Sequence, residues 1–261
     1  MVRQVTFASD QMRQTFARAG FKSFDDFYLG PDTGTDGPVR RNIDVLTIND
    51  EQLYLKRFNS VHLKDIVFAA LVEGRPVSQA KFEWSNARHL EKAGITSLEF
   101  VAAGSSHCCG LLRKSFNISR KLAGIPLSQY VCQSWQDLSN DQRRRLMQAL
   151  GKFAAKLHHA RISFPDLYLW HIYWEPQTQL CEQNFALLDL HRMSRNRRGV
   201  RYRIENLARL DHSLSPQYFD APLRRLLLET YLADYPARTK NFAEKVLHRS
   251  AQISTRRNVK Y

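Results

Sequence analysis

The chain has 261 residues, of which 43% are hydrophobic and 25% charged, a composition that excludes disordered and collagen-like proteins. Its length suffices for one large domain or two small lobes. No stretch approaches the roughly 20 apolar residues that span a bilayer, and the N-terminal residues lack the apolar region of a secretory signal. We therefore expect a cytoplasmic protein, either free or peripheral to the inner membrane.

Basic residues outnumber acidic ones by 39 to 25, which gives a formal net charge of +14. A field of that sign attracts polyanions such as nucleic acid, anionic lipid headgroups or phosphorylated substrates. The excess concentrates in Arg192–Arg203 and in the C-terminal string STRRNVKY, and either run could also be a solvated basic face. Charge alone does not choose among these partners.

The four cysteines are Cys108, Cys109, Cys132 and Cys181, and no pair has C-x-x-C spacing. Neither a zinc site nor a disulfide framework follows from them. We expect reduced thiols, as in the cytosol.

Strand patterns dominate the first half of the chain. Ser23–Gly30 is expected to be a strand, followed by a turn-rich segment at 31–38. Arg41–Ile48 and Glu51–Phe58 are expected to be strands, and Asn49-Asp50 between them predicts a hairpin turn. These segments predict a small antiparallel sheet.

A helix is expected next, from a cap at Ser78 to a C-terminal stop at Gly94, with Glu83, Ala87 and Leu90 on one stripe. Two further strands are expected at 97–104 and 110–119. The segment 121–131 is then typical of a connector that leads into a short helix.

The second half is mostly helical. Ser139 and Gln142 have the spacing of a capping box, and an apolar stripe follows at 146, 150, 153 and 157. A small hairpin is expected between His171 and Asp189, and helices are expected around 208–214 and within 222–235. The order of elements predicts an α+β fold in two lobes, residues 1–122 and residues 123–261.

Four ionisable residues stand in segments that a chain normally keeps apolar: Lys56, Glu83, Asp166 and Asp189. Each alone could be a surface charge at the edge of an element. The set is harder to explain in this way, because a buried Lys needs a carboxylate and a buried Glu needs a cation. Lys56 and Glu83 could each be the charged partner that the other needs.

Phosphoryl transfer requires such a set: a Lys fixed by a Glu, an Asp for the metal, an Asp for the acceptor hydroxyl and a second polar metal ligand. Protein kinases place these groups in a constant order along the chain. The same order is found in Gly30–Gly37, Lys56, Glu83, Asp166, His171 and Asp189. The interval from Asp166 to His171 equals the kinase D-x-x-x-x-N spacing, so the order and the spacing predict a kinase.

The strings LYLKRF, FEWSNARHLEKAGI, DLYLWH and LLDLHRM resemble the lipopolysaccharide core kinase family, which includes heptose kinases and kinases of the Kdo sugar. That family has His where protein kinases have Asn and D-L-H-R where they have D-F-G, as His171 and Asp189–Arg192 do here. The resemblance covers Gly30–Tyr235. It implies a bilobal protein-kinase-like fold, with an antiparallel sheet and one helix in the N-terminal lobe and a mostly helical C-terminal lobe.

The resemblance also implies roles for individual residues. Lys56 would bind the α- and β-phosphates of ATP and be held by Glu83. Asp166 would orient the sugar hydroxyl and take its proton, while Asp189 and His171 would face Mg²⁺.

The nucleotide would be covered by the loop that carries Gly34 and Gly37, although these glycines lack the G-x-G-x-x-G spacing. Arg192 would lie beside the phosphates or the acceptor. Arg197 and Arg198, in the basic segment that follows the metal Asp, are expected to bind the anionic acceptor. The implied acceptor is a sugar hydroxyl of the lipopolysaccharide core, on an anionic glycolipid at the inner membrane face.

One segment departs from the family, which has His-Arg-Asp where this chain has Phe164-Pro165-Asp166. The change removes a cation, and Pro165 fixes its own φ and restricts Phe164. Three hypotheses therefore stay open: a lipopolysaccharide kinase, a kinase of another small molecule or of a protein, and a catalytically impaired binding module. No helix-turn-helix, zinc finger or RNP string is seen, so we do not expect nucleic acid as a partner.

Overall fold

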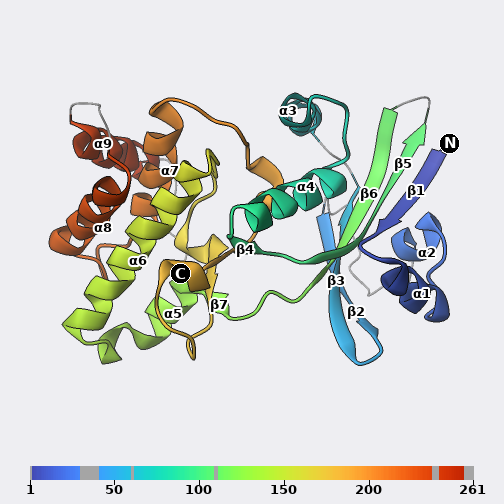
Figure 1. Cartoon of the computed structure of the whole chain (residues 1–261), viewed down its shortest axis with the longest axis horizontal. Coiled ribbons are helices and arrows are strands. Elements are labelled where there is room, and N and C mark those ends of the chain that lie inside the picture. Colours follow the sequence, from blue (N-terminus) through green and yellow to red (C-terminus); the bar gives the residue numbers. More distant parts are fainter. Residues whose placement is uncertain (1, 30–40, 60–61, 109–110, 237–240, 256–261) are drawn as a thin grey trace. The chain divides into compact units, whose positions relative to one another are not determined.

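The computed structural model describes residues 2–29, 41–59, 62–108, 111–236 and 241–255. The expected nucleotide loop with Gly34 and Gly37 lies outside these residues, as does most of the C-terminal basic string. The chain divides into two compact units (Figure 1). The sheet unit comprises Met1–His89 and Leu98–Leu122, and the helical unit comprises Leu90–Ser97 and Ala123–Tyr261.

The sheet unit is built on a five-stranded antiparallel sheet with the strand order β1-β5-β6-β3-β2. Its strands are β1 (Val2–Phe7), β2 (Arg41–Ile48), β3 (Glu51–Phe58), β5 (Phe100–Cys108) and β6 (Leu111–Arg120). Asn49 and Asp50 join β2 to β3 with φ of 49° and 63°, the left-handed values that a type I′ hairpin turn needs. The predicted hairpin and the two later strands are confirmed, whereas the sequence pattern does not predict β1.

One expected strand of the sheet unit is wrong, because Ser23–Gly30 contains a helix. The helices that begin in this unit are α1 (Asp10–Arg18), α2 (Phe24–Tyr28), α3 (Leu63–Glu73) and α4 (Gln79–Lys92). The one helix expected here is α4, and the other three are additional. Ser23 Oγ accepts a hydrogen bond from the Asp26 N–H, and Asp26 Oδ2 accepts one from the Ser23 N–H. This capping box begins α2 and overrides the strand-like pattern.

Aromatic side chains fill the core on one face of the sheet. The rings of Phe27 and Phe116 stack with their centroids 5.0 Å apart, and Leu55 of β3 packs into the same cluster. Side chains alternate along a strand, so the neighbouring Lys56 points to the opposite face. That opposite face is where the candidate site of this unit lies.

The helical unit contains α5 (Leu127–Ser134), α6 (Asn140–His159), α7 (Arg201–His212), α8 (Ala221–Asp234) and α9 (Phe242–Ser254). Its small sheet has the order β4-β9-β8-β7, made of β4 (Thr96–Ser97), β9 (Ala186–Leu187), β8 (Ile172–Trp174) and β7 (Ile125–Pro126). The predicted hairpin is confirmed, as is the α6 capping box of Ser139 and Gln142. The helix expected around 208–214 is the end of a longer helix, α7, and the sequence pattern does not predict α9. Among the described helices, none has the length and apolar character that a bilayer span requires.

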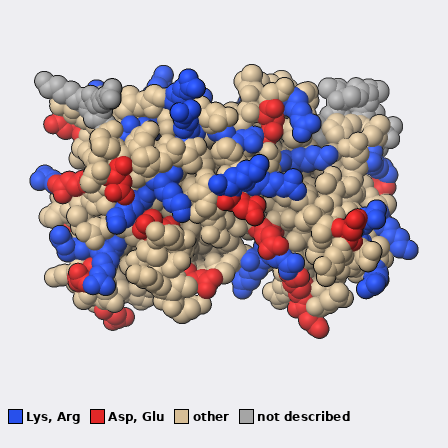
Figure 2. Space-filling model, viewed as in Figure 1, with Lys and Arg blue, Asp and Glu red and all other residues tan. Residues whose placement is uncertain are grey.

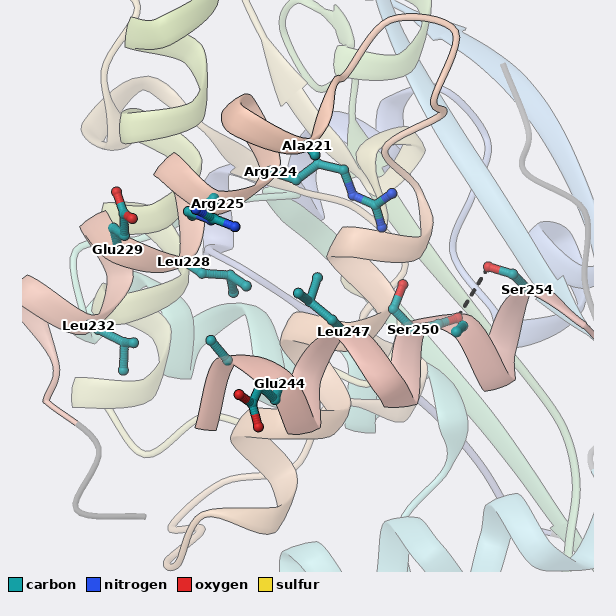
Figure 3. Close-up of a pocket in the computed structure, with 12 residues that line it drawn as sticks. Ala221, Arg224, Arg225, Leu228, Glu229, Leu232, Glu244, Leu247, Ser250 and Ser254 are labelled. Atoms are coloured by element: carbon teal, nitrogen blue, oxygen red, sulfur yellow. Dashed lines mark hydrogen bonds between the residues drawn. The ribbon is translucent and has the colours of Figure 1, made fainter. Parts of the chain in front are cut away.

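Two surface features do not single out the candidate residues. Figure 2 shows Lys and Arg side chains spread over the drawn face, with Asp and Glu side chains among them. A groove of about 770 Å³ lies between α8 and α9, lined by Arg225, Leu228 and Leu247 among others (Figure 3). No candidate residue lines this groove.

His158 joins three helices of the helical unit. Its Nδ1 lies 2.9 Å from the Tyr231 hydroxyl of α8, and its Nε2 lies 3.3 Å from Asn206 Oδ1 of α7. Because the Asn206 oxygen can only accept, Nε2 carries the proton and Nδ1 accepts from Tyr231. Burial of the ring lowers the pKa of His158 from 6.5 to about 3, so the imidazole is neutral at physiological pH.

We expect His158 to make the protein less stable as the pH falls below about 6.5. The folded state keeps this imidazole neutral down to about pH 3, whereas the unfolded state binds a proton near pH 6.5. The free energy of unfolding should therefore fall by up to about 1.4 kcal/mol per pH unit between these values.

Denaturant unfolding from about pH 7.5 to about pH 4.5 measures this dependence. His158→Gln should be less stable than the wild type at neutral pH but should lose stability less steeply on acidification. The exposed neighbour His159, changed to Gln, is the control. Equal slopes for the wild type and His158→Gln would contradict the prediction.

Candidate active site

Lys56 and Glu83 form an ion pair in the sheet unit. Lys56 Nζ lies 2.8 Å from Glu83 Oε1 and 3.2 Å from Oε2. Glu83 stands in the second turn of α4 and is almost completely buried. The carboxylate is therefore excluded from water and depends on the ammonium group for its charge balance. The pair in turn holds the end of the lysine side chain at a defined point of the sheet.

Asn117 completes this ion pair, and the sequence pattern does not identify it. Its Nδ2 donates to Glu83 Oε2 at 3.1 Å, and it stands directly opposite Lys56 in the β3–β6 register. Opposite residues of an antiparallel pair share a face, which brings both side chains to the carboxylate. In the sequence, Asn117 is marked only by being a polar residue between Phe116 and Ile118. Its contact with Glu83 follows from the strand register.

The same face of the sheet exposes aliphatic side chains. Ile43 stands opposite Lys56 and Val45 opposite Tyr54 in the β2–β3 register, and both aliphatic side chains are exposed. Apolar surface beside a fixed ammonium group suits a ligand that has a flat apolar part and an anionic part.

Asp166 lies in the 163–168 loop of the helical unit, which α7 anchors. The Phe164 N–H donates to Asn206 Oδ1 at 2.9 Å, and the Asp166 carbonyl accepts the Tyr168 N–H at 2.8 Å. Asp166 Oδ1 lies 3.2 Å from Arg192 Nη1, whereas Oδ2 is buried without a hydrogen-bond partner among the described residues. Leaving a buried carboxylate oxygen unpaired is unfavourable, which points to a task beyond folding.

The pairing of β8 with β9 places the backbone of His171 beside Leu188, the residue before Asp189. The Leu188 N–H, one residue before Asp189, donates to the His171 carbonyl at 2.9 Å. His171 Nδ1 lies 2.8 Å from the Asp166 carbonyl, which can only accept, so Nδ1 carries the proton. This contact leaves Nε2 as the ring nitrogen that is available to bind a metal.

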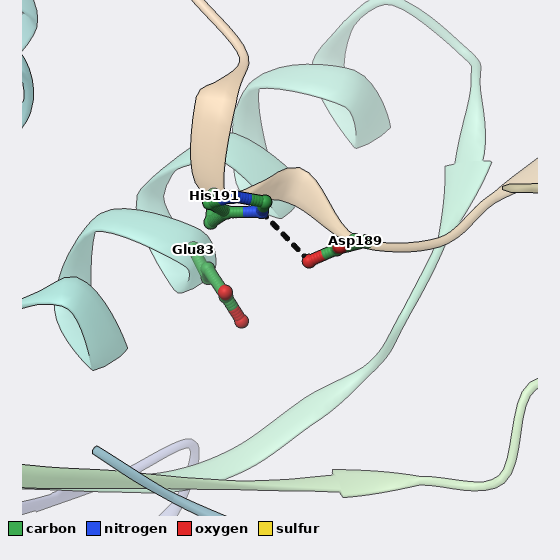
Figure 4. A group of neighbouring side chains, drawn as sticks. All are labelled: Glu83, Asp189 and His191. Carbon is green, nitrogen blue, oxygen red and sulfur yellow. Dashed lines mark hydrogen bonds and ion pairs between the residues drawn. The ribbon is translucent and has the colours of Figure 1, made fainter. Parts of the chain in front are cut away.

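Asp189 follows β9 in a left-handed backbone conformation. Its φ and ψ are 65° and 68°, values that are uncommon for a residue with a side chain and concentrate at functional sites. His191 Nδ1 lies 2.8 Å from Asp189 Oδ1 and holds that oxygen (Figure 4). The turn leads into a short 3₁₀ helix, η4 (Leu190–Arg192), which carries Arg192 to Asp166.

The structure thus groups the expected residues within each unit. The sheet unit joins Lys56 to Glu83, and the helical unit joins Asp166 to His171 and Arg192. The expected substrate residues Arg197 and Arg198 follow η4 and are exposed.

Comparison with known proteins gives consistent matches. The family model described as "Lipopolysaccharide kinase (Kdo/WaaP) family" matches residues 38–231. Lipopolysaccharide core heptose(I) kinase WaaP of Pseudomonas aeruginosa is 26% identical over 192 residues, which are 67% of this chain and 72% of that protein. A solved structure of WaaP in complex with acyl carrier protein has a TM-score of 0.70 at 18% identity and covers 97% of this chain and 98% of that chain. The autoinhibited serine kinase domain of titin has a TM-score of 0.43 at 9% identity, over 80% and 69% of the two chains.

The antiparallel sheet with its paired lysine, followed by helices and two aspartates, is the plan of a protein-kinase-like phosphotransferase, and the structural match supports that fold. Because the family model matches well over half of the chain, the chain belongs to the lipopolysaccharide kinase (Kdo/WaaP) family. It is therefore a kinase, and the expected family and α+β fold are confirmed.

The ion pair of the sheet unit predicts an unequal double-mutant cycle. Lys56→Met leaves the Glu83 carboxylate buried without its cation, which should destabilise the protein by about 3 kcal/mol. Adding Glu83→Gln removes the buried charge and keeps the shape, so the double variant should recover part of that stability. Denaturant unfolding measures both effects, with the exposed Lys92 of α4 changed to Met as the control. A double variant less stable than Lys56→Met would show that the pair is not the reason for the loss.

Proposed function

We propose that this kinase transfers the γ-phosphoryl group of ATP, with Mg²⁺, to a hydroxyl of a heptose or Kdo sugar in the lipopolysaccharide core. The family description and the curated relative named as a core heptose(I) kinase support a core sugar as the acceptor. The observation that carries the proposal is Asp166 Oδ2, a buried carboxylate oxygen without a partner among the described residues. An acceptor hydroxyl is a group that would satisfy it.

Groups of the sheet unit suit the nucleotide. Lys56 offers a fixed ammonium group to the α- and β-phosphates, and Glu83 holds it in place. Ile43 and Val45 expose aliphatic surface on the same face of the sheet, which suits an adenine base. The face therefore offers complementary surface to both ends of ATP.

Asp189 and His171 are the residues that would hold the metal ion. A carboxylate is a ligand that Mg²⁺ favours, and His171 would add Nε2, so the donor set fits a divalent cation that keeps several waters. Bound Mg²⁺ supplies charge neutralisation for the transferred phosphoryl group. His191 fixes one oxygen of Asp189, as outer partners of metal ligands commonly do.

Asp166 would serve as the base. The acceptor oxygen forms a bond to the γ-phosphorus while the bond from that phosphorus to the ADP oxygen breaks, and the hydroxyl proton passes to Asp166 Oδ2. The exposed Arg197 and Arg198 would attract the anionic acceptor.

Helix α3 supports contact with the membrane that carries such an acceptor. Leu63, Val67 and Leu71 are spaced at i, i+4 and i+8, so they share one face, and they are 75%, 49% and 78% exposed. A helix of a soluble protein normally buries such a stripe. The exposed Lys64 and Arg75 lie near its two ends, and basic residues beside an apolar stripe suit an anionic bilayer surface. The proposed occupant of this α3 stripe is the headgroup region of the inner membrane at its cytoplasmic face.

Magnesium-dependent binding of ATP tests the proposed function. Isothermal calorimetry should detect binding by the wild type, and Asp189→Ala should weaken it at least about tenfold because a metal ligand is lost. Asp141→Ala, which removes an exposed carboxylate from the first turn of α6, is the matched control.

Absence of ATP binding by the wild type would exclude the phosphotransfer proposal. Equal binding by Asp189→Ala would exclude the metal assignment alone. Transfer of label from ATP to isolated lipopolysaccharide core, compared with other sugars and with proteins, then identifies the acceptor class.

The α3 stripe predicts binding to anionic vesicles. Changing Leu63, Val67 and Leu71 together to Ser should weaken cosedimentation at least about tenfold, since about 1.4 kcal/mol of apolar burial corresponds to one decade of affinity. The double variant Val2→Ser and Leu29→Ser, which removes exposed aliphatic side chains of the same unit, should bind as the wild type does.

Binding should also be weaker to neutral vesicles and at high salt. A wild type that does not bind vesicles would refute the membrane contact. A wild type that forms dimers, which the triple variant abolishes, would refute it too and would assign the stripe to a protein partner.

A further inference from the structure

Asp166 has no cation beside it in the sequence. Phe164 and Pro165 precede it, and Leu167 and Tyr168 follow it, yet its side chain is only 9% exposed. An anion so nearly excluded from water needs a positive partner or hydrogen-bond donors. Such a partner has to come from elsewhere in the fold.

Arg192 is a partner of this kind. Its Nη1 lies 3.2 Å from Asp166 Oδ1. Two backbone hydrogen bonds of 2.9 Å join Ser163 to Ser194 in an antiparallel bridge. Asp166 lies three residues after Ser163 and Arg192 two residues before Ser194, so the bridge holds their backbones close together. The backbone pairing therefore places Asp166 and Arg192 close together, whatever conformations their side chains adopt.

We infer that Arg192 is a positioning residue for Asp166 and supplies the cation that the 163–168 loop itself lacks. The inference rests on the proposed function, because it concerns the base of the same reaction. By engaging Oδ1, the guanidinium group fixes the rotation of the carboxylate and leaves Oδ2 for the acceptor hydroxyl. Arg192 thus acts on the base and not on the nucleotide.

The exposure of the two side chains separates this role from a purely structural one. The Arg192 side chain is 44% exposed, so by itself it contributes little to the stability of the fold. Its loss leaves the buried carboxylate without a cation, and the effect should concentrate on the orientation of Asp166. The expected result is a large loss of turnover, together with a small shift of the unfolding midpoint that depends on the presence of Asp166.

The first experiment needs no substrate. Denaturant unfolding of Arg192→Gln, Asp166→Asn and the double variant measures whether the two side chains are coupled. Arg192→Gln should shift the unfolding midpoint when Asp166 is present and should have no effect in the Asp166→Asn background. Additive shifts would overturn the contact, whatever the activity of the protein.

The second experiment measures ATP turnover with isolated lipopolysaccharide core oligosaccharide as the acceptor. Arg192→Gln should lower kcat by about 10- to 100-fold, within the usual contribution of a positioned base, and leave the KM for ATP within about twofold. Arg192→Lys should retain part of the activity. Methylguanidinium in solution should restore part of the activity of Arg192→Ala but none of that of Asp166→Asn.

Arg201→Gln is the matched control, since it removes an exposed arginine from the start of α7. An equal loss in this control, an unchanged kcat in Arg192→Gln, or a raised KM for ATP at constant kcat would overturn the positioning role. A wild type without any turnover counts against the proposed function, and the unfolding cycle then still decides whether Arg192 and Asp166 are coupled.

Discussion

A carboxylate taken out of water must find partners, and each unit of this kinase is organised around one such group. Glu83 is satisfied by Lys56 and Asn117, and it thereby fixes the lysine on the face of the sheet opposite the aromatic core. Asp166 is satisfied at one oxygen by Arg192, and its other oxygen has no partner among the described residues. The first arrangement is a completed ion pair. The second leaves one buried carboxylate oxygen, the atom to which the proposed function assigns the acceptor hydroxyl, because a buried acceptor gains most from a donor.

Apolar packing and helix anchoring give the Asp166 loop its shape. Phe164 is buried, its N–H donates to Asn206 of α7, and Pro165 has no N–H to satisfy. Asn206 Oδ1 also accepts from the neutral His158 of α6, so two helices hold the loop through one amide oxygen. The Phe164-Pro165 sequence therefore forms a loop that α7 anchors, and the cation near the proposed base is Arg192.

Features that depend on nearby residues could be predicted from the sequence. The hairpin at Asn49-Asp50 and the α6 capping box of Ser139 and Gln142 are set by hydrogen bonds within a few positions. The family resemblance could be recognised for the same reason, since the sequence motifs that carry it are short and continuous. The strand expected at Ser23–Gly30 was wrong because its apolar spacing is also compatible with one helical turn, and the Ser23 cap decided between the two.

The remaining features were decided by tertiary structure. Asn117 reaches Glu83 only because the β3–β6 register sets it opposite Lys56, and Arg192 reaches Asp166 only because Ser163 bridges to Ser194. The exposure of the α3 stripe likewise depends on tertiary packing, in which Phe68 of α3 contacts Phe82 of α4. By itself the sequence determined which chemical groups are present and in what order. Their contacts depend on pairings between residues tens of positions apart, which no local pattern records, because register is fixed by the packing of the whole sheet or loop.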